Sequence, residues 1–155
     1  MAQPMHEHWT KRSVEFSDTD LGGLIHFSRY LIYMETAEHE FRNAAGLSVS
    51  ALVEGEHLSW PRLSAGCEFL GPVGFEDELD IRVFVLRKGG KSLTFGCEFF
   101  FNGTLVARGE MSSACCILRP DEPLQSVEIP PILAAHIDQV SEEERKAWQP
   151  PIRPL

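Results

Sequence analysis

The clearest pattern near the N-terminus is a strand-like run followed by a long helical repeat. Residues 11–16 alternate polar and apolar side chains, which would place Val14 and Phe16 on one side of an extended chain. Further on, apolar side chains recur at helical spacing at Tyr30, Tyr33, Met34, Ala37, Phe41, Ala44 and Ala45. This spacing predicts a long helix that buries one stripe and ends at Gly46 as a left-handed cap.

The middle of the chain predicts an antiparallel sheet. Alternation and strand-favouring composition predict strands over residues 79–85 and 93–101, a long one over 105–118, and one near 58–70. The paired glycines within residues 88–91 and the Asn102-Gly103 dipeptide predict hairpins between these strands. A sheet wrapped around one long helix would bury the apolar face of each element.

Length and proline content set the domain organisation. A chain of 155 residues corresponds to about one domain. We expect the main body over residues 1–120, and a Pro-rich tail over residues 121–155 as part of the same domain. The tail should contain short helices, one over residues 132–140 and one that begins after Ser141 and ends near Trp148.

Composition and charge narrow the class of protein. Hydrophobic residues at 43% and charged residues at 24% are ordinary globular values, so disorder is not indicated. No apolar run approaches the ~20 residues of a spanning helix, and residues 1–8 lack a signal-peptide pattern, so we expect a cytoplasmic protein without a membrane partner. The net charge of −9 argues against nonspecific nucleic-acid binding. Cys67, Cys97, Cys115 and Cys116 lack metal-ligand spacing and are expected to be reduced, buried residues without a metal.

The residues most suggestive of chemistry lie in the loop before the long helix. Asp18, Asp20, Gly22 and Gly23 stand between the first strand and the positive end of the helix. The chain has no Gly-x-Ser-x-Gly elbow, no Gly-x-Gly-x-x-Gly fingerprint and no Walker loop. The sequence therefore disfavours serine-hydrolase, dinucleotide and nucleotide-hydrolysing chemistry.

This loop resembles the signature of hotdog-fold acyl-CoA thioesterases of the 4-hydroxybenzoyl-CoA thioesterase type. In that family an Asp-x-Asp-x-x-Gly element precedes a Tyr near the start of the central helix, which here are Asp18, Asp20, Gly23 and Tyr30. The likeness continues through residues 60–64 and the turn at residues 87–92, and covers roughly residues 8–118. The resemblance implies an α+β hotdog fold, with an antiparallel sheet wrapped around one long central helix.

The resemblance also implies an activity and a set of site residues. It implies hydrolysis of an acyl-CoA to a free acid and CoA, with Asp20 as nucleophile or general base and the backbone N–H of Phe27 polarising the carbonyl. The implied substrate contacts are Gly23, Tyr30, Ser64, Arg87, Lys88 and Lys91, the last three toward the CoA phosphates. No cofactor is implied, because coenzyme A is part of the substrate, and an acyl-carrier-protein thioester stays open as an alternative substrate.

Structural interpretations compete for several of these residues. Asp20 could instead cap a turn, and Asp18 is expected to hold the loop in an Asx-turn. His26 is expected to be a structural or rim residue, since many relatives place their histidine one position later, where this chain has Phe27. Glu35 is expected to be solvated or ion-paired. Tyr30 and Tyr33 fit a core at this spacing, and the three cations fit a solvated hairpin tip equally well.

Two further functions and an assembly follow from the same resemblance. One alternative is an acyl-CoA- or acyl-carrier-protein-binding hotdog protein without turnover, and the other is a hotdog dehydratase or hydratase. A single small hotdog unit leaves strand edges and one sheet face exposed, so we expect a homo-oligomer, a homotetramer built as a dimer of dimers.

Overall fold

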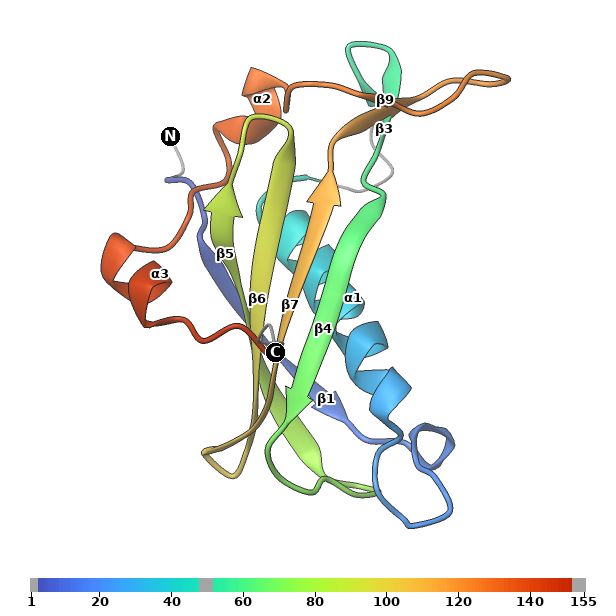
Figure 1. Ribbon diagram of the computed structural model, residues 1–155, viewed down its shortest axis with the longest axis vertical. Coiled ribbons are helices and arrows are strands. Elements are labelled where there is room, and N and C mark those ends of the chain that lie inside the picture. The colour runs from blue at the N-terminus through green and yellow to red at the C-terminus, as the bar shows by residue number, and fades with distance from the viewer. Residues whose placement is uncertain (1–2, 48–51, 152–155) are drawn as a thin grey trace.

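A computed structural model describes residues 3–47 and 52–151. Its centre is a five-stranded antiparallel sheet with one long helix lying across one face (Figure 1). The strands, in spatial order, are β1 (Glu7–Ser13), β5 (Glu78–Lys88), β6 (Ser92–Phe101), β7 (Thr104–Ala114) and β4 (Arg62–Phe69). The strands β1 and β4 are therefore the two edges of the sheet.

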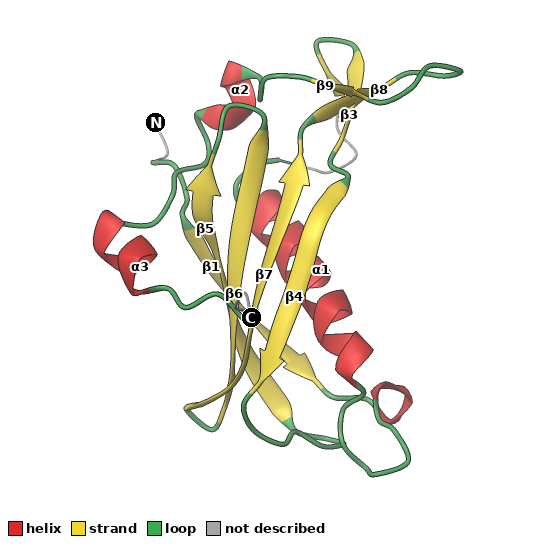
Figure 2. Ribbon diagram, in the orientation of Figure 1, coloured by secondary structure: helices red, strands yellow, loops and turns green. Residues whose placement is uncertain are grey.

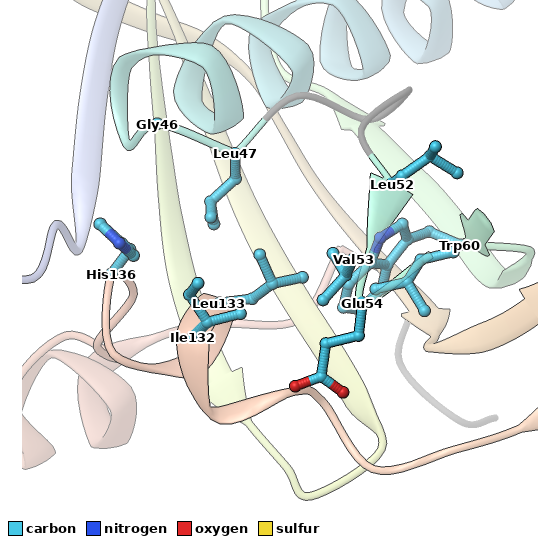
Figure 3. A pocket seen from close by; sticks show the side chains of 10 residues that line it. Gly46, Leu47, Leu52, Val53, Glu54, Trp60, Ile132, Leu133 and His136 are labelled. Atoms are coloured by element: carbon cyan, nitrogen blue, oxygen red, sulfur yellow. The ribbon is translucent and has the colours of Figure 1, made fainter. Parts of the chain in front are cut away.

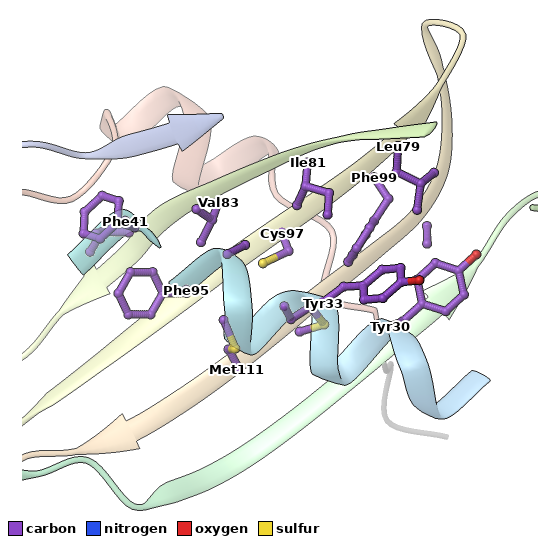
Figure 4. Packing of buried hydrophobic residues seen from close by; sticks show 14 of the residues in the cluster. Tyr30, Tyr33, Phe41, Leu79, Ile81, Val83, Phe95, Cys97, Phe99 and Met111 are labelled. Carbon is purple, nitrogen blue, oxygen red and sulfur yellow. The ribbon is translucent and has the colours of Figure 1, made fainter. Parts of the chain in front are cut away.

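The helix α1 (Phe27–Ala44) packs its apolar stripe against the inward-facing residues of the sheet. Figure 4 shows this core, in which Phe41 meets Phe95 edge-on with the ring centroids 5.4 Å apart. The other buried apolar helix residues are Tyr30, Tyr33, Met34 and Ala37. Gly46 has a φ of +81°, which confirms the predicted left-handed cap. The arrangement is the expected α+β hotdog fold.

A second, smaller sheet contains β2 (Leu52–Val53), β3 (Glu56–Ser59), β8 (Cys116–Leu118) and β9 (Gln125–Ser126), in that order. The strands expected over residues 58–70 and 105–118 are each broken in two, so those boundaries were wrong. The breaks fall at Trp60-Pro61 and at Cys115, where Ala114 N–H donates to Pro61 and Cys115 N–H donates to Lys91. Each long strand thus leaves the main sheet and pairs again in the smaller one.

The first strand also differs from its expected position. It ends at Ser13, and a 3-10 turn, η1 (Phe16–Asp18), follows it. Val14 is buried, but Phe16 is 76% exposed and makes an edge contact with Phe75. The alternation fails because Val14 N–H donates to the Asp77 carbonyl at 2.9 Å, which anchors the chain where it turns.

The tail contains two short helices, α2 (Pro131–Ala134) and α3 (Glu142–Ala147), shown in Figure 2. Ser141 caps α3 as expected, with its side chain accepting from the Glu144 N–H. The helix expected over residues 132–140 was wrong after Ala134. There the chain turns at Ala135 and His136 and then runs beside Met5, which donates its N–H to His136 and accepts from the Asp138 N–H.

The four cysteines are all free thiols, and burial raises the pKa of Cys67 to about 12 and that of Cys115 to about 11. Such thiols are poor nucleophiles at neutral pH. Within the described ranges, no helix is both long enough and apolar enough to cross a membrane.

Candidate active site

The loop between β1 and α1 carries two carboxylates in opposite surroundings. Asp18 closes the η1 turn and is only 6% exposed, whereas Asp20 is exposed two residues later. The two side chains therefore do not project to one side, as an extended loop would have them. The 3-10 turn turns Asp18 inward, and this separates the roles of the two carboxylates.

Asp18 joins the loop to the helix. Its Oδ2 accepts from the Tyr33 hydroxyl at 2.6 Å and from the Glu15 N–H at 3.0 Å, and its backbone carbonyl accepts from the His26 N–H at 2.8 Å. Burial alone would raise the pKa of Asp18, but these side-chain and backbone donors, with the guanidiniums of Arg12 and Arg29, lower it. The Asx-turn expected at Asp18 is wrong, and the residue is a buried anchor instead.

Asp20 makes the Asx-type contact of this loop. Its Oδ1 accepts from the Gly22 N–H at 2.9 Å, and its backbone N–H donates to Leu24 at 2.9 Å. Gly23 follows with a φ of +79°, a conformation that side-chain-bearing residues rarely adopt. Asp20 Oδ2 has no partner within residues 3–47 and 52–151. One carboxylate oxygen is thus left open for chemistry.

The start of α1 leaves a donor open at the same end of the molecule. His26 is the N-cap, and its Nδ1 accepts from the Ser28 N–H at 3.3 Å, which confirms a structural role. The His26 ring stacks on Phe27 with the centroids 4.4 Å apart. The Phe27 N–H has no acceptor in the described part of the chain. An unpaired N–H in the first helical turn, supported by the helix dipole, favours negative charge.

Two expected substrate contacts have other surroundings. Tyr30 is 3% exposed, and its ring packs against Phe69 and Phe99 at centroid distances of 5.1 and 5.2 Å. Burial raises the pKa of Tyr30 to about 12. Ser64 pairs with Ser112 on β7. The next pair, Ala65 and Met111, faces α1, so Ser64 lies on the opposite face of the sheet. Within one chain, Ser64 therefore does not join Asp20.

The three expected CoA cations lie at the other end of α1. Arg87 pairs with Glu110 at 2.8 Å, and Lys88 Nζ donates to the carbonyls of Ile137 and Ala134 at 2.8 and 3.2 Å. The Lys91 side chain is exposed, and its ammonium group has no partner in the described ranges. Figure 1 shows this hairpin beside α2, whereas the Asp20 loop lies at the opposite tip, about 27 Å away along the 18 residues of α1. One chain does not bring the cations to Asp20.

Sequence reasoning missed a buried ion cluster in the middle of α1. Glu38 is 2% exposed and accepts at 2.9 Å both from Arg42, one turn later, and from Arg62 on β4. Arg42 also lies over the Trp60 ring, 4.4 Å from its centroid. The i,i+4 spacing of Glu38 and Arg42 was the available signal. Glu35, the helix carboxylate that the sequence analysis considered, is exposed. Its carboxylate lies 3.7 Å from the Arg62 guanidinium, as the ion-paired interpretation expected.

Two hollows flank this cluster. A polar cleft of about 430 Å³ opens over it, lined by Glu35, Glu38, His39, Arg42, His57, Leu58, Ser59, Trp60, Arg62 and Leu118. An apolar pocket of about 310 Å³ lies at the C-terminal end of α1, where Figure 3 shows Leu47 and Leu133 pointing toward one another. Both hollows lie away from the Asp20 loop within one chain.

Comparison with known proteins agrees with the fold. A Haemophilus influenzae protein named acyl-CoA thioesterase YbgC is 22% identical over 111 residues, covering 72% of this chain and 82% of that protein. A 1,4-dihydroxy-2-naphthoyl-CoA hydrolase of Synechococcus sp. is 29% identical over 103 residues, covering 63% and 69%. The structure of a gentisyl-coenzyme A thioesterase aligns with a TM-score of 0.72 and 25% identity, over 82% of this chain and 99% of that one. The thioesterase-like superfamily matches residues 14–137, and the chain belongs to this superfamily.

Proposed function

We propose that the protein hydrolyses an acyl-CoA thioester to a free acid and CoA at the tip of α1 that carries Asp20. The observation that carries this proposal is the pair of uncommitted polar groups there, Asp20 Oδ2 and the Phe27 N–H. The names of two relatives, an acyl-CoA thioesterase and an aroyl-CoA hydrolase, support the same reaction.

The reaction needs an oxygen to attack the carbonyl carbon and a donor for the oxyanion that forms. In our proposal the Phe27 N–H stabilises that oxyanion, helped by the positive end of α1. Asp20 either attacks the carbonyl itself, with water later cleaving the resulting anhydride, or takes a proton from the attacking water. The thiolate of CoA leaves and is protonated. These groups supply the chemistry without a cofactor beyond the CoA of the substrate.

We propose that the site is completed by a second copy of the chain. The strand β4 is an open edge on which Leu63 and Phe69 are 65% and 51% exposed, and the α1 tip beside it exposes Phe27 and Leu31. An open edge flanked by apolar side chains favours pairing between copies. Such pairing can bring Lys91 of one copy toward Asp20 of another. A homotetramer built from dimers, in the cytoplasm, remains our proposal for the working form.

The test is thiol release from a panel of aromatic, short-chain and long-chain acyl-CoAs, together with an acyl-carrier-protein thioester. We expect thiol release from at least one thioester, and loss of that release in Asp20→Asn. Acyl-CoA binding without thiol release would favour a binding protein. Water addition to an enoyl-CoA without hydrolysis would favour a hydratase. Either result would overturn the proposal.

A further inference from the structure

The sheet face opposite α1, here called the outer face, carries apolar side chains that the helix cannot cover. Along β5, Val83 belongs to the core under α1, whereas Phe84 and Leu86 belong to a separate cluster with Val140 of the tail. Phe84 and Leu86 are nevertheless only 2% and 1% exposed. Their burial depends on the tail, because the other two apolar residues of this cluster, Val140 and Trp148, both belong to the tail.

The first residues of the tail join the sheet at the edge of β5, beyond the start of β1. Val140 N–H donates to the Val85 carbonyl at 2.9 Å, and Gln139 accepts from the Lys88 N–H at 3.0 Å. The β5 groups in these bonds are backbone atoms on the strand edge that also bonds His6. The tail therefore continues the packing of the sheet itself.

The tail then crosses the central strands. The Trp148 ring meets Phe84 edge-on at 5.2 Å, and its indole N–H donates to Glu110 of β7 at 2.9 Å. Arg82 of β5 pairs with Glu144 of α3 at 2.9 Å. Figure 1 shows the red segment passing over the face that turns away from α1. Residues 138–151, here called the tail cover, thus close the outer face from β5 to β7.

The tail cover comes after the part of the chain that defines the superfamily, because that match ends at residue 137. At β4 the end of the tail cover lies beside the strand, since Pro150 and Pro151 line a hollow with Ser64 and Gly66. Leu63 of β4 nevertheless stays 65% exposed. This chain therefore protects one apolar surface with its own residues and leaves the other open.

We propose that the tail cover occupies a self-association surface, in the place that the outer face of a second copy of this chain would otherwise take. Without the tail cover, Phe84 and Leu86 would be exposed. The same sheet face carries cations and anions side by side, namely Arg82, Arg108, Glu98 and Glu110. Two such faces related by a two-fold axis can place apolar side chains together and opposite charges near each other. The cover would thus limit assembly to the β4 and α1 side. This inference is independent of the catalytic proposal.

The main test is the molar mass of a chain that ends at Ile137, measured by sedimentation equilibrium against the full chain. The shortened chain keeps the bond from the Met5 N–H to His136 and both acceptors of Lys88 Nζ, the carbonyls of Ala134 and Ile137. We expect the shortened chain to form a defined species of at least about twice the full chain's mass. Adding Leu86→Asp to the shortened chain should return the mass to that of the full chain. An unchanged mass of the shortened chain, or a gain that Leu86→Asp leaves in place, would overturn the proposal.

A second variant keeps the test decisive if the shortened chain does not fold. The full-length double variant Glu144→Arg, Trp148→Ala places a cation against Arg82 and removes the ring from Phe84. We expect faster amide hydrogen exchange over residues 138–148 and association that increases with protein concentration. Lys146→Ala is the matched control, since Lys146 lies on the same helix and is 75% exposed. Faster exchange with an unchanged mass at all concentrations would overturn the proposal.

Discussion

The two tips of α1 carry similar sequence features and use them differently. Each has a loop with two adjacent glycines beside charged side chains, Asp20 at one tip and Lys88 at the other. At the hairpin tip, Lys88 is bonded to two carbonyls of the tail, and its neighbour Arg87 is paired with Glu110. At the Asp20 tip, a carboxylate oxygen and a helix N–H are left without protein partners in the described residues.

The difference separates charges that hold the fold from groups that are available for chemistry. A cation with two acceptors gains little from a further anion, because that anion must compete for its donors. An open carboxylate oxygen, on the loop that leads to an unpaired helix N–H, can instead act on a polarised carbonyl. The following predictions test whether this division between the two tips holds.

The largest effect is expected for Asp20→Asn, which keeps the shape of the side chain but removes its charge. Assistance by a positioned base contributes about 10²–10⁴ in rate, so kcat should fall at least about 10²-fold. The fold should be unchanged, because Asp20 is exposed. Thiol-release kinetics measure the effect, with Asp121→Asn, another exposed carboxylate, as the control. A near wild-type rate in Asp20→Asn would move the chemistry away from this tip.

The next effect is expected for Asp18→Asn, which weakens the anchor between the loop and α1. Loss of charge-assisted hydrogen bonds from Tyr33 and the Glu15 N–H should lower the free energy of unfolding by about 1.5–3 kcal/mol. The fall in kcat should be smaller than for Asp20→Asn, since the reacting groups remain. Urea unfolding and thiol release check both expectations. A fully inactive but stable Asp18→Asn protein would reverse the assigned roles of the two carboxylates.

Smaller effects are expected at the hairpin tip, where single substitutions should separate two roles. Lys88→Ala should lower the free energy of unfolding by about 1 kcal/mol, because Ile137 and Ala134 lose a donor. Lys91→Ala should leave stability unchanged and raise KM for acyl-CoA by about 2–5-fold. A pantetheine thioester without the nucleotide phosphates is the control substrate. An equal rise in KM for both substrates would exclude Lys91 from phosphate binding.

The smallest effect is a pH dependence of stability. Because the folded-state pKa of Asp18 is lowered, its contribution is complete above the ordinary value of 3.8 and is lost as the pH falls through the lower folded value. The stability difference between wild type and Asp18→Asn should therefore shrink at acidic pH. Tyr33→Phe removes a donor and should move this loss to higher pH. A difference that stays constant down to the acid transition would contradict the ionised anchor.

Local signals were enough to predict the main elements. The apolar stripe of α1, its end at Gly46 and the hairpin at Asn102-Gly103 were all predicted correctly, since each depends on residues close together in the chain. The motif around Asp20 likewise led to the superfamily that residues 14–137 match. The sequence by itself thus determined the hotdog fold and the loop that carries the candidate chemistry.

Tertiary structure decided what each charged side chain does. Asp18 and Tyr33 are 15 residues apart, Arg62 and Glu38 are 24 apart, and Lys88 and Ile137 are 49 apart. Periodicity describes only which side of an element a residue occupies, so it could not show that Asp18 turns inward or that the tail takes up Lys88. Such pairings arise only when distant elements pack, because a buried charge must find its partner wherever the fold brings one.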